Sequence, residues 1–246
     1  MESIIYQKTA AVEENHWWFS GRRRLVQYIL DGLPLPKNSQ ILEIGCGTGG
    51  NLALLSAYGE LHAIEPHEAA RVWAENRGVA HILPGSLPDG LPYEEPRFDL
   101  VVMTDVLEHV AEDLQALKRV RQILKADGYI VVTVPATPWL WSEHDRLHHH
   151  QRRYTRRTLT EIFLNAGYRI RFISYTNMVL FPLIAAARLG KSRLGTAGTD
   201  DLTMTPALIN HLLQKIFAGE RHLFKLGSLP FGVSLLLLAT PKGTGR

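Results

Sequence analysis

The chain has 246 residues, of which 46% are hydrophobic and 21% are charged, as in an ordinary globular protein. This length suffices for one large α/β domain with a buried core, and the composition excludes a disordered chain or a fibrous repeat. The formal net charge is +3, which is small for this length, so the overall charge gives no reason to expect a nucleic-acid partner.

The single cysteine, Cys46, excludes an internal disulfide and fits a reducing compartment. The N-terminal residues lack the basic start and the apolar stretch of a secretion signal. Apolar runs reach at most residues 179–187 and 233–239, well short of the ~18–20 residues of a membrane span. We therefore expect a cytoplasmic protein without a membrane-spanning helix.

Apolar residues among Glu, Arg and Gln at 11–30 predict one or two amphipathic helices, which end at Asp31-Gly32. Residues 1–36 are treated as an N-terminal helical cap. Short apolar runs then alternate with helical stretches. The expected strands are 40–44, 61–64, 79–83, 98–103 and 129–134, and the expected helices are 51–58, 68–76 and 114–124. This alternation predicts a parallel sheet with right-handed crossovers.

After these elements we expect a His/Arg-rich loop at 141–157, a helix at 158–166 and a strand at 168–175. An irregular insertion follows at 177–230, with a helix that begins at Thr205-Pro206, and the last strand is expected at 232–240. No internal repeat or low-complexity linker is found, which favours a single domain over residues 1–246. An insertion beside the rim of a ligand site usually shapes the pocket, and we expect this of 177–230.

The segment from Ile41 to Asn51, ILEIGCGTGGN, lies between a predicted strand and a predicted helix. Its glycines permit a sharp turn and a close approach of a ligand to the backbone, and the helix N-terminus suits a phosphate or a carboxylate. The glycines also satisfy the dinucleotide spacing G-x-G-x-x-G, and Glu65 lies 20 residues beyond Gly45. A nicotinamide-dependent oxidoreductase therefore competes with other cofactor classes, and a tight turn without a ligand is a third interpretation.

Three features argue against a dinucleotide. Glu43 precedes the glycine loop by two residues. A buried carboxylate there would repel the negative charge of a pyrophosphate but would attract an ammonium group. The fourth predicted strand is followed by Thr104-Asp-Val-Leu-Glu-His109, and the last strand follows an irregular segment, which is consistent with antiparallel insertion. Together the two motifs, from about residue 40 to 175, resemble the class I S-adenosylmethionine-dependent methyltransferases with E-x-G-C-G-x-G and D-V-L-E-H signatures.

The resemblance implies a doubly wound α/β fold with a seven-stranded, mostly parallel sheet, an antiparallel last strand and helices on both faces. It implies S-adenosylmethionine as cofactor and S-adenosylhomocysteine as product, with Glu65 accepting hydrogen bonds from both ribose hydroxyls. Many relatives carry an acidic residue where Ser86 stands. The expected cofactor-binding residues are Trp18, Arg23, Glu43, Gly45, Cys46, Gly47, Asn51, Glu65, Pro66, Gly85, Ser86, Leu87, Thr104, Asp105, Val106 and His109.

Trp17-Trp18-Phe19 and the arginines at 22–24 resemble a leader helix that closes over the cofactor, where an aromatic residue covers the site and an arginine reaches the methionine carboxylate. Trp18 and Arg23 are assigned these roles. The alternative is that the aromatic side chains pack on the sheet edge while the arginines remain solvated.

Residues 144–154 resemble the H-D…H-x-R-R-Y pattern of a methyltransferase subgroup, with His149 in place of an expected glycine. His144 or His150 would act as a general base, or the arginines would bind an anionic group of the substrate. Alternatively the segment is a structural latch, in which Asp145 pairs with Arg152 or Arg153 and Tyr154 packs. A metal site built from His144, Asp145 and His148 is not expected, because spacing alone establishes no ligand geometry.

The expected reaction is in-line methyl transfer to a hydroxyl oxygen of a small or lipid- or sugar-linked metabolite, with His144 or His150 assisting proton removal. The acceptor is expected to be hydrophobic or anionic, and peripheral contact with a membrane is compatible with the basic and apolar helix of the insertion. The alternatives are N- or C-methyltransfer, a nicotinamide-dependent oxidoreductase, and a cofactor-binding scaffold without turnover. Acceptor, oligomeric state and pathway are not determined by the sequence.

Overall fold

Seven strands form one sheet in the computed structural model, which describes residues 3–194 and 203–243. They are β1 (Ser39–Ile44), β2 (Gly59–Ile64), β3 (His81–Leu83), β4 (Phe98–Thr104), β5 (Leu124–Pro135), β6 (Tyr168–Thr176) and β7 (Ser234–Pro241), in the order β3-β2-β1-β4-β5-β7-β6. The pairs from β3 through β5 are parallel, and β7 is antiparallel to both β5 and β6. The predicted mostly parallel sheet with an antiparallel last strand is confirmed.

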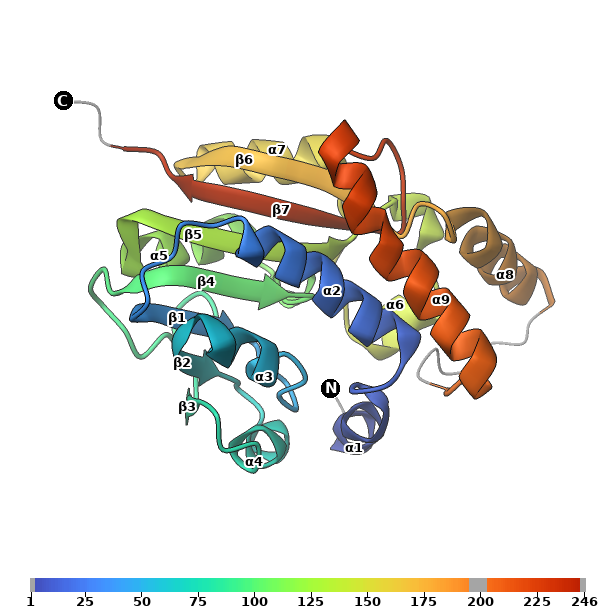
Figure 1. Ribbon diagram of the computed structural model, residues 1–246, viewed down its shortest axis with the longest axis horizontal. Coiled ribbons are helices and arrows are strands. Elements are labelled where there is room, and N and C mark those ends of the chain that lie inside the picture. The colour runs from blue at the N-terminus through green and yellow to red at the C-terminus, as the bar shows by residue number, and fades with distance from the viewer. Residues whose placement is uncertain (1–2, 195–202, 244–246) are drawn as a thin grey trace.

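Helices cover both faces of this sheet (Figure 1). The α-helices are α1 (Ser3–Val12), α2 (Trp17–Asp31), α3 (Leu52–Leu55), α4 (Glu68–Glu75), α5 (Asp113–Ile123), α6 (Glu143–Leu147), α7 (Arg156–Asn165), α8 (Phe181–Leu194) and α9 (Ala207–Gly219), and the 3₁₀ helices are η1 (Ser56–Tyr58), η2 (Leu107–His109), η3 (Pro138–Leu140) and η4 (Glu220–Leu226). In Figure 1, α2, α3 and α9 lie in front of the sheet and α5 and α7 lie behind it.

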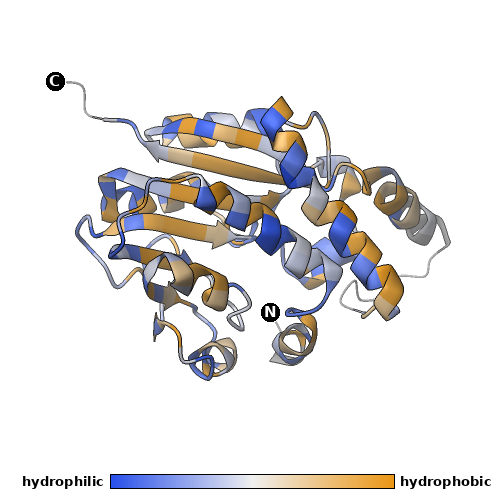
Figure 2. Ribbon diagram, in the orientation of Figure 1, coloured by the Kyte–Doolittle hydropathy of each residue, from blue (hydrophilic) through white to orange (hydrophobic). Residues whose placement is uncertain are grey.

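The central strand β4 shows why its sequence is almost entirely apolar. Leu100 and Val102 belong to the core cluster under α2 and α3, whereas Val101 and Met103 belong to the cluster under α5 and α7. All four side chains are fully buried. A parallel strand covered on both faces needs apolar residues at every position, and Figure 2 shows β4 and β7 coloured as hydrophobic along most of their length. The sheet is thus a rigid base for the loops at its carboxyl edge.

The structure differs from the sequence-based expectation in several segments. Helix α1 precedes the helices expected at 11–30, and helix α6 lies within the expected loop 141–157. β5 begins at Leu124, which pairs with Phe98, five residues before the predicted start. The pairing resumes at Leu100 and Tyr129 after an irregularity, and beside it the Lys125 ammonium group contacts the Asp99 carboxylate at 2.8 Å. The segment 177–230 contains the unexpected helix α8 beside the expected α9, and its residues 195–202 lie outside the described residues.

Helix α9 lies along α2 on the front face of the sheet (Figure 1). The Phe217 ring is 6.2 Å from the Trp17 ring and 5.5 Å from the Trp18 ring, measured between centroids. The Asn210 side chain accepts a hydrogen bond from the Trp17 backbone N–H at 2.9 Å. The insertion is thereby tied to the N-terminal helices. None of the described helices is long and apolar enough to span a membrane.

Candidate active site

A cavity of about 1100 Å³ opens at the carboxyl edge of the parallel strands. Its walls come from the loops after β1, β2, β3, β4 and β5, together with α1, α2, α8 and α9. Ligands of doubly wound sheets bind at this edge. The volume exceeds the ~300–1000 Å³ of a typical small-ligand pocket, which leaves room for two ligands side by side.

The glycine loop after β1 exposes backbone atoms to the cavity, because Gly45 and Gly47 have no side chain. Gly45 has φ +70°, and a Cβ there would lie 2.7 Å from Cγ2 of Val106, so only glycine fits. Gly47 has φ +54°, and no atom lies within 4 Å of the position that its Cβ would occupy. The Gly47 backbone therefore faces open space in the cavity wall, where a ligand can press against it.

Glu43 lies beneath this loop and outside the cavity lining. Its Oε1 accepts a hydrogen bond from Nδ2 of Asn51 at 2.8 Å, and the same amide nitrogen donates to Oγ1 of Thr104 at 2.9 Å. Burial raises the pKa of Glu43 to about 8. This geometry supports a role in holding Asn51, which does line the cavity, in place of the direct cofactor contact expected from the sequence.

Glu65, directly after β2, is 4% exposed and reaches the cavity wall. Oε2 accepts a hydrogen bond from the Gly47 backbone N–H at 2.9 Å, and Oε1 accepts one from the His67 N–H at 3.0 Å. The Tyr6 hydroxyl also interacts with this carboxylate, and the lone pairs left on its oxygens can accept hydrogen bonds from a ligand. Burial and the neighbouring Glu65 raise the pKa of Tyr6, whose ring lines the same end of the cavity.

Arg22 and Arg23 of α2 make different contacts. Arg23 donates to the backbone carbonyls of Glu13 and Glu14 at 2.8 and 2.7 Å, and its side chain does not line the cavity. Arg22 lines the cavity and forms an ion pair with Asp105. The arginine that faces the cavity is thus the neighbour of the expected one, since successive residues of a helix point about 100° apart.

The segment after β5 is held by one buried carboxylate. Asp145 is fully buried and accepts hydrogen bonds from Nε of Arg153 at 2.7 Å and from the Ser142 backbone N–H at 2.8 Å. Nδ1 of His150 lies 2.9 Å from its Oδ1. Burial alone would raise the pKa of Asp145, but the hydrogen bonds from His150 and Arg153 lower it. The Asp145–Arg153 pairing is that of the structural latch considered from the sequence.

The other half of the latch joins this segment to α5. Arg152 contacts the Asp113 carboxylate at 2.6 Å, and the Tyr154 hydroxyl donates to the same carboxylate at 2.9 Å. Tyr154 is 3% exposed. These side chains are engaged in structural contacts, which leaves the histidines of the segment to face the cavity.

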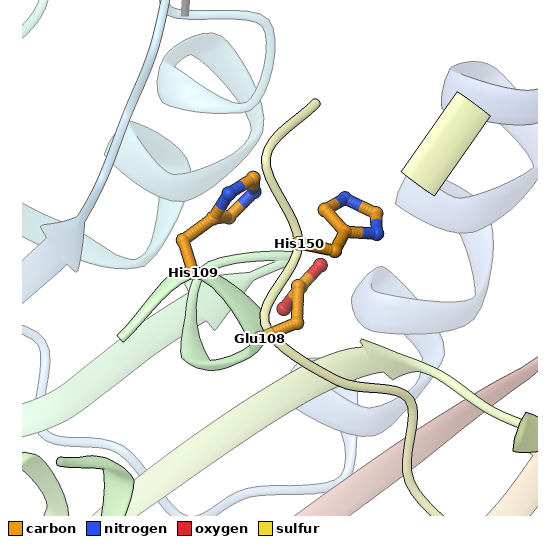
Figure 3. Close-up of side chains that lie close together, drawn as sticks. All are labelled: Glu108, His109 and His150. Carbon is orange, nitrogen blue, oxygen red and sulfur yellow. The ribbon is translucent and has the colours of Figure 1, made fainter. Parts of the chain in front are cut away.

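His109, His144 and His150 all line the cavity. The ring centroids of His109 and His150 are 4.8 Å apart, and those of His144 and His150 are 5.9 Å apart. Burial lowers the pKa of His109 to about 4 and that of His144 to about 3, so both rings are neutral at pH 7. Glu108 lies beside them, fully buried, and burial raises its pKa well above the ordinary value. Figure 3 shows Glu108, His109 and His150 close together.

The cavity brings together most of the residues predicted from the sequence. Those that line it are Trp18, Gly45, Cys46, Gly47, Asn51, Glu65, Pro66, Gly85, Ser86, Leu87, Thr104, Asp105, Val106, His109, His144 and His150. Arg23 and Glu43 do not line it. The sequence reasoning missed Tyr6, Glu13, Arg22, Glu108 and Arg188 as lining residues. The pairing of Glu and His at 108 and 109 was noticed in the motif, but no sequence pattern shows that both face the same cavity.

Comparison with known proteins agrees with this architecture. A family model described as a methyltransferase domain matches residues 15–171. A ubiquinone biosynthesis O-methyltransferase from Cereibacter sphaeroides is 34% identical over 104 residues, which are 40% of this chain and 42% of that protein. The chain spans about two fifths of the length of the curated relatives it matches.

Solved structures share the fold at low sequence identity. A chain of the complex between the Haloferax volcanii Trm112 methyltransferase activator and a methyltransferase matches with a TM-score of 0.66 at 17% identity, covering 99% of this chain and 96% of that one. Phosphoethanolamine N-methyltransferase 2 from Haemonchus contortus, solved with S-adenosyl-L-methionine, matches with a TM-score of 0.59 at 14% identity, covering 89% of this chain and 52% of that one.

Proposed function

Because this chain belongs to the methyltransferase-domain family, we propose that it is an S-adenosylmethionine-dependent methyltransferase that transfers the methyl group to a hydroxyl oxygen of a small acceptor. One observation carries the proposal: a single cavity of about 1100 Å³ has the glycine loop and Glu65 among its lining residues together with His109, His144 and His150. The first group suits the cofactor, and the second suits an acceptor that must lose a proton.

The lining residues fit the chemical groups of the cofactor. The Glu65 carboxylate keeps acceptor positions for the two ribose hydroxyls, and hydrogen bonds to a charged group contribute about 1.5–3 kcal/mol each. The opposite charges of Arg22 and Asp105 match the carboxylate and the ammonium group of the methionine end. Pro66 and Leu87 provide an apolar surface for the adenine. When bound, S-adenosylmethionine supplies an electrophilic methyl group on its sulfonium.

The protein's own residues orient the acceptor and take its proton. Asp145 holds the His150 ring through Nδ1, which leaves Nε2 as the atom able to accept a proton in the cavity. A carboxylate that fixes the tautomer and orientation of a histidine is the arrangement used by hydrolytic triads. His144 lines the same cavity and is a second candidate base. Alignment of the oxygen with the methyl carbon supplies most of the remaining rate enhancement.

The insertion shapes the part of the cavity that would take the acceptor. Ile184 and Ala187 of α8 and Leu213 of α9 contribute apolar surface there, and Arg188 contributes a positive charge. This mixture supports a hydrophobic acceptor with an anionic group, such as a small or lipid- or sugar-linked metabolite. The similarity to ubiquinone biosynthesis O-methyltransferases, which covers 40% of this chain, supports oxygen as the methylated atom.

The test is product analysis with ¹³C-methyl-labelled S-adenosylmethionine and a panel of phenols, carboxylates and amines. Formation of S-adenosylhomocysteine together with a labelled O-methyl resonance supports the proposal. A labelled N-methyl or C-methyl product would replace oxygen by another acceptor atom. Tight cofactor binding without methyl loss on any acceptor would favour the scaffold interpretation, and reduction of a nicotinamide cofactor would favour the oxidoreductase.

A further inference from the structure

Glu108 is a buried carboxyl group whose oxygens have no hydrogen-bond partner. Its side chain is 0% exposed, and neither Oε1 nor Oε2 finds a donor among the described residues. An unsatisfied buried polar atom costs roughly 1–3 kcal/mol and is rare in native proteins, so each instance needs a physical explanation. A bound cation is such an explanation.

Two imidazoles lie next to this carboxyl group. One ligand atom each from Glu108, His109 and His150 can be chosen so that all three atoms lie within 4.8 Å of one another. Figure 3 shows Glu108 and His109 projecting from the η2 turn toward His150 on the facing loop. Zinc binds nitrogen and oxygen ligands at ~2.0–2.2 Å in a tetrahedron, so these three atoms would have to move closer together when the ion binds.

The surroundings of His150 match those of a metal ligand. Its Nδ1 is engaged with Asp145 at 2.9 Å, and Asp145 is in turn held by Arg153 at 2.7 Å. Histidines that bind metals usually donate their second ring N–H to a carboxylate or a carbonyl, which fixes the tautomer and leaves Nε2 as the ligand atom. Asp145 therefore orients a ligand and is not itself available to bind a metal ion. This argues against the metal site of His144, Asp145 and His148 that was considered from the sequence.

We propose that Glu108, His109 and His150 bind a divalent transition-metal ion, zinc in the first instance, at the acceptor end of the cavity. Two imidazole nitrogens and one carboxylate oxygen form a three-ligand set of the kind that leaves the fourth zinc position open. Magnesium and calcium prefer all-oxygen sites. All three residues line the cavity, so the open position faces it.

This inference rests on the proposed function, to which it adds a role for the ion. The open position takes the acceptor hydroxyl and lowers its pKa. The acceptor proton is then released to water, the oxygen lone pair forms the new bond to the methyl carbon, and the carbon–sulfur bond breaks to give S-adenosylhomocysteine. His150 then acts as a ligand, and the ion replaces a histidine base in activating the hydroxyl.

The experiment uses the full chain stripped with a chelator and titrated with Zn²⁺ or Co²⁺, with Mg²⁺ for comparison. The expected results are one equivalent of bound Zn²⁺, a Co²⁺ absorption spectrum typical of four ligands, and no Mg²⁺ binding at equal concentration. Glu108→Gln keeps the shape of the side chain and is expected to weaken Zn²⁺ binding about 100-fold or more, or ~2.7 kcal/mol. His148→Gln changes a cavity-lining histidine outside the set and is expected to leave Zn²⁺ affinity within about twofold.

Calorimetric binding of S-adenosylmethionine to each variant shows whether the cavity is intact and separates the two proposals. Loss of Zn²⁺ in Glu108→Gln with cofactor binding retained supports the metal site. Absence of Zn²⁺ binding in a wild-type protein that binds the cofactor overturns the metal site and leaves the methyltransferase proposal standing. Equal loss of Zn²⁺ affinity in His148→Gln and Glu108→Gln also overturns the assignment.

Discussion

Arg22 in α2 forms an ion pair with Asp105, 83 positions further along the chain at the end of β4. The pair joins the N-terminal helices to the carboxyl edge of the sheet and places one positive and one negative charge in the cavity wall. A zwitterionic amino-acid group needs both charges. The pair therefore ties the N-terminal helices to the edge of the sheet at which we propose that the cofactor binds.

Replacing Arg22 by alanine is expected to weaken S-adenosylmethionine binding about tenfold or more (~1.4 kcal/mol), because the methionine carboxylate loses its cation and Asp105 loses its partner. Arg24, an exposed residue that contacts Gln27, is the matched control and its replacement should leave affinity unchanged. Isothermal calorimetry measures both. Equal affinities of the two variants would show that Arg22 does not contact the cofactor.

The sequence could not predict which of Arg22 and Arg23 faces the cavity. The motif indicates that an arginine of the leader helix serves the site, but the helix rotation that selects Arg22 depends on packing of α2 against the sheet and α9. The strand β4, in contrast, was predicted to within one residue, because a continuous apolar run such as 98–103 has few alternative structures. The glycine loop and Glu65 were found because spacing along the chain defines them.

Contacts between distant segments could not be predicted. Nothing in the sequence shows that Glu108 and His150 face each other, since they belong to different loops 42 positions apart. Helix α8 was missed because the insertion lacks the strand–helix alternation that guided the other assignments. The Asp145–Arg153 pair was one of three interpretations, and only the fold selects it.

Gly45→Ala is expected to lower the free energy of unfolding by about 2–4 kcal/mol. The added Cβ would lie 2.7 Å from Val106, and φ +70° is costly for any residue with a Cβ. Gly219→Ala, where a Cβ meets no atom within 4 Å, is the control and should cause no loss. Urea denaturation measures both, and equal stabilities would contradict the close approach of Gly45 to Val106.

Asp145→Asn is expected to cost about 3–5 kcal/mol of stability, because it leaves the buried Arg153 guanidinium without a counter-charge. Glu143→Gln removes an exposed pair with Arg146 and should cost at most about 1 kcal/mol. Thermal and urea unfolding compare the two variants. A cost for Asp145→Asn no larger than that for Glu143→Gln would argue against the structural latch.

Glu43 makes stability depend on pH in a direction that can be worked out. Burial raises its pKa from 4.5 to about 8, so between these pH values the folded protein keeps a proton that the unfolded chain releases. Stability therefore falls as pH rises from about 4.5 to about 8. Glu43→Gln keeps the oxygen that Asn51 contacts, and it should be more stable than wild type at pH 8 by on the order of 4 kcal/mol, with little difference at pH 4.5. Urea titrations at both pH values test this, and parallel pH profiles would rule it out.

The most direct test of the central claim is calorimetric binding of S-adenosylmethionine, S-adenosylhomocysteine and NAD to the wild type, Glu65→Ala and the exposed control Glu68→Ala. The account predicts binding of the two adenosyl ligands but not NAD. It also predicts that Glu65→Ala weakens their affinity about tenfold or more (~1.4 kcal/mol), with no change in Glu68→Ala. Binding of NAD without S-adenosylmethionine would contradict the account and assign the glycine loop to a dinucleotide.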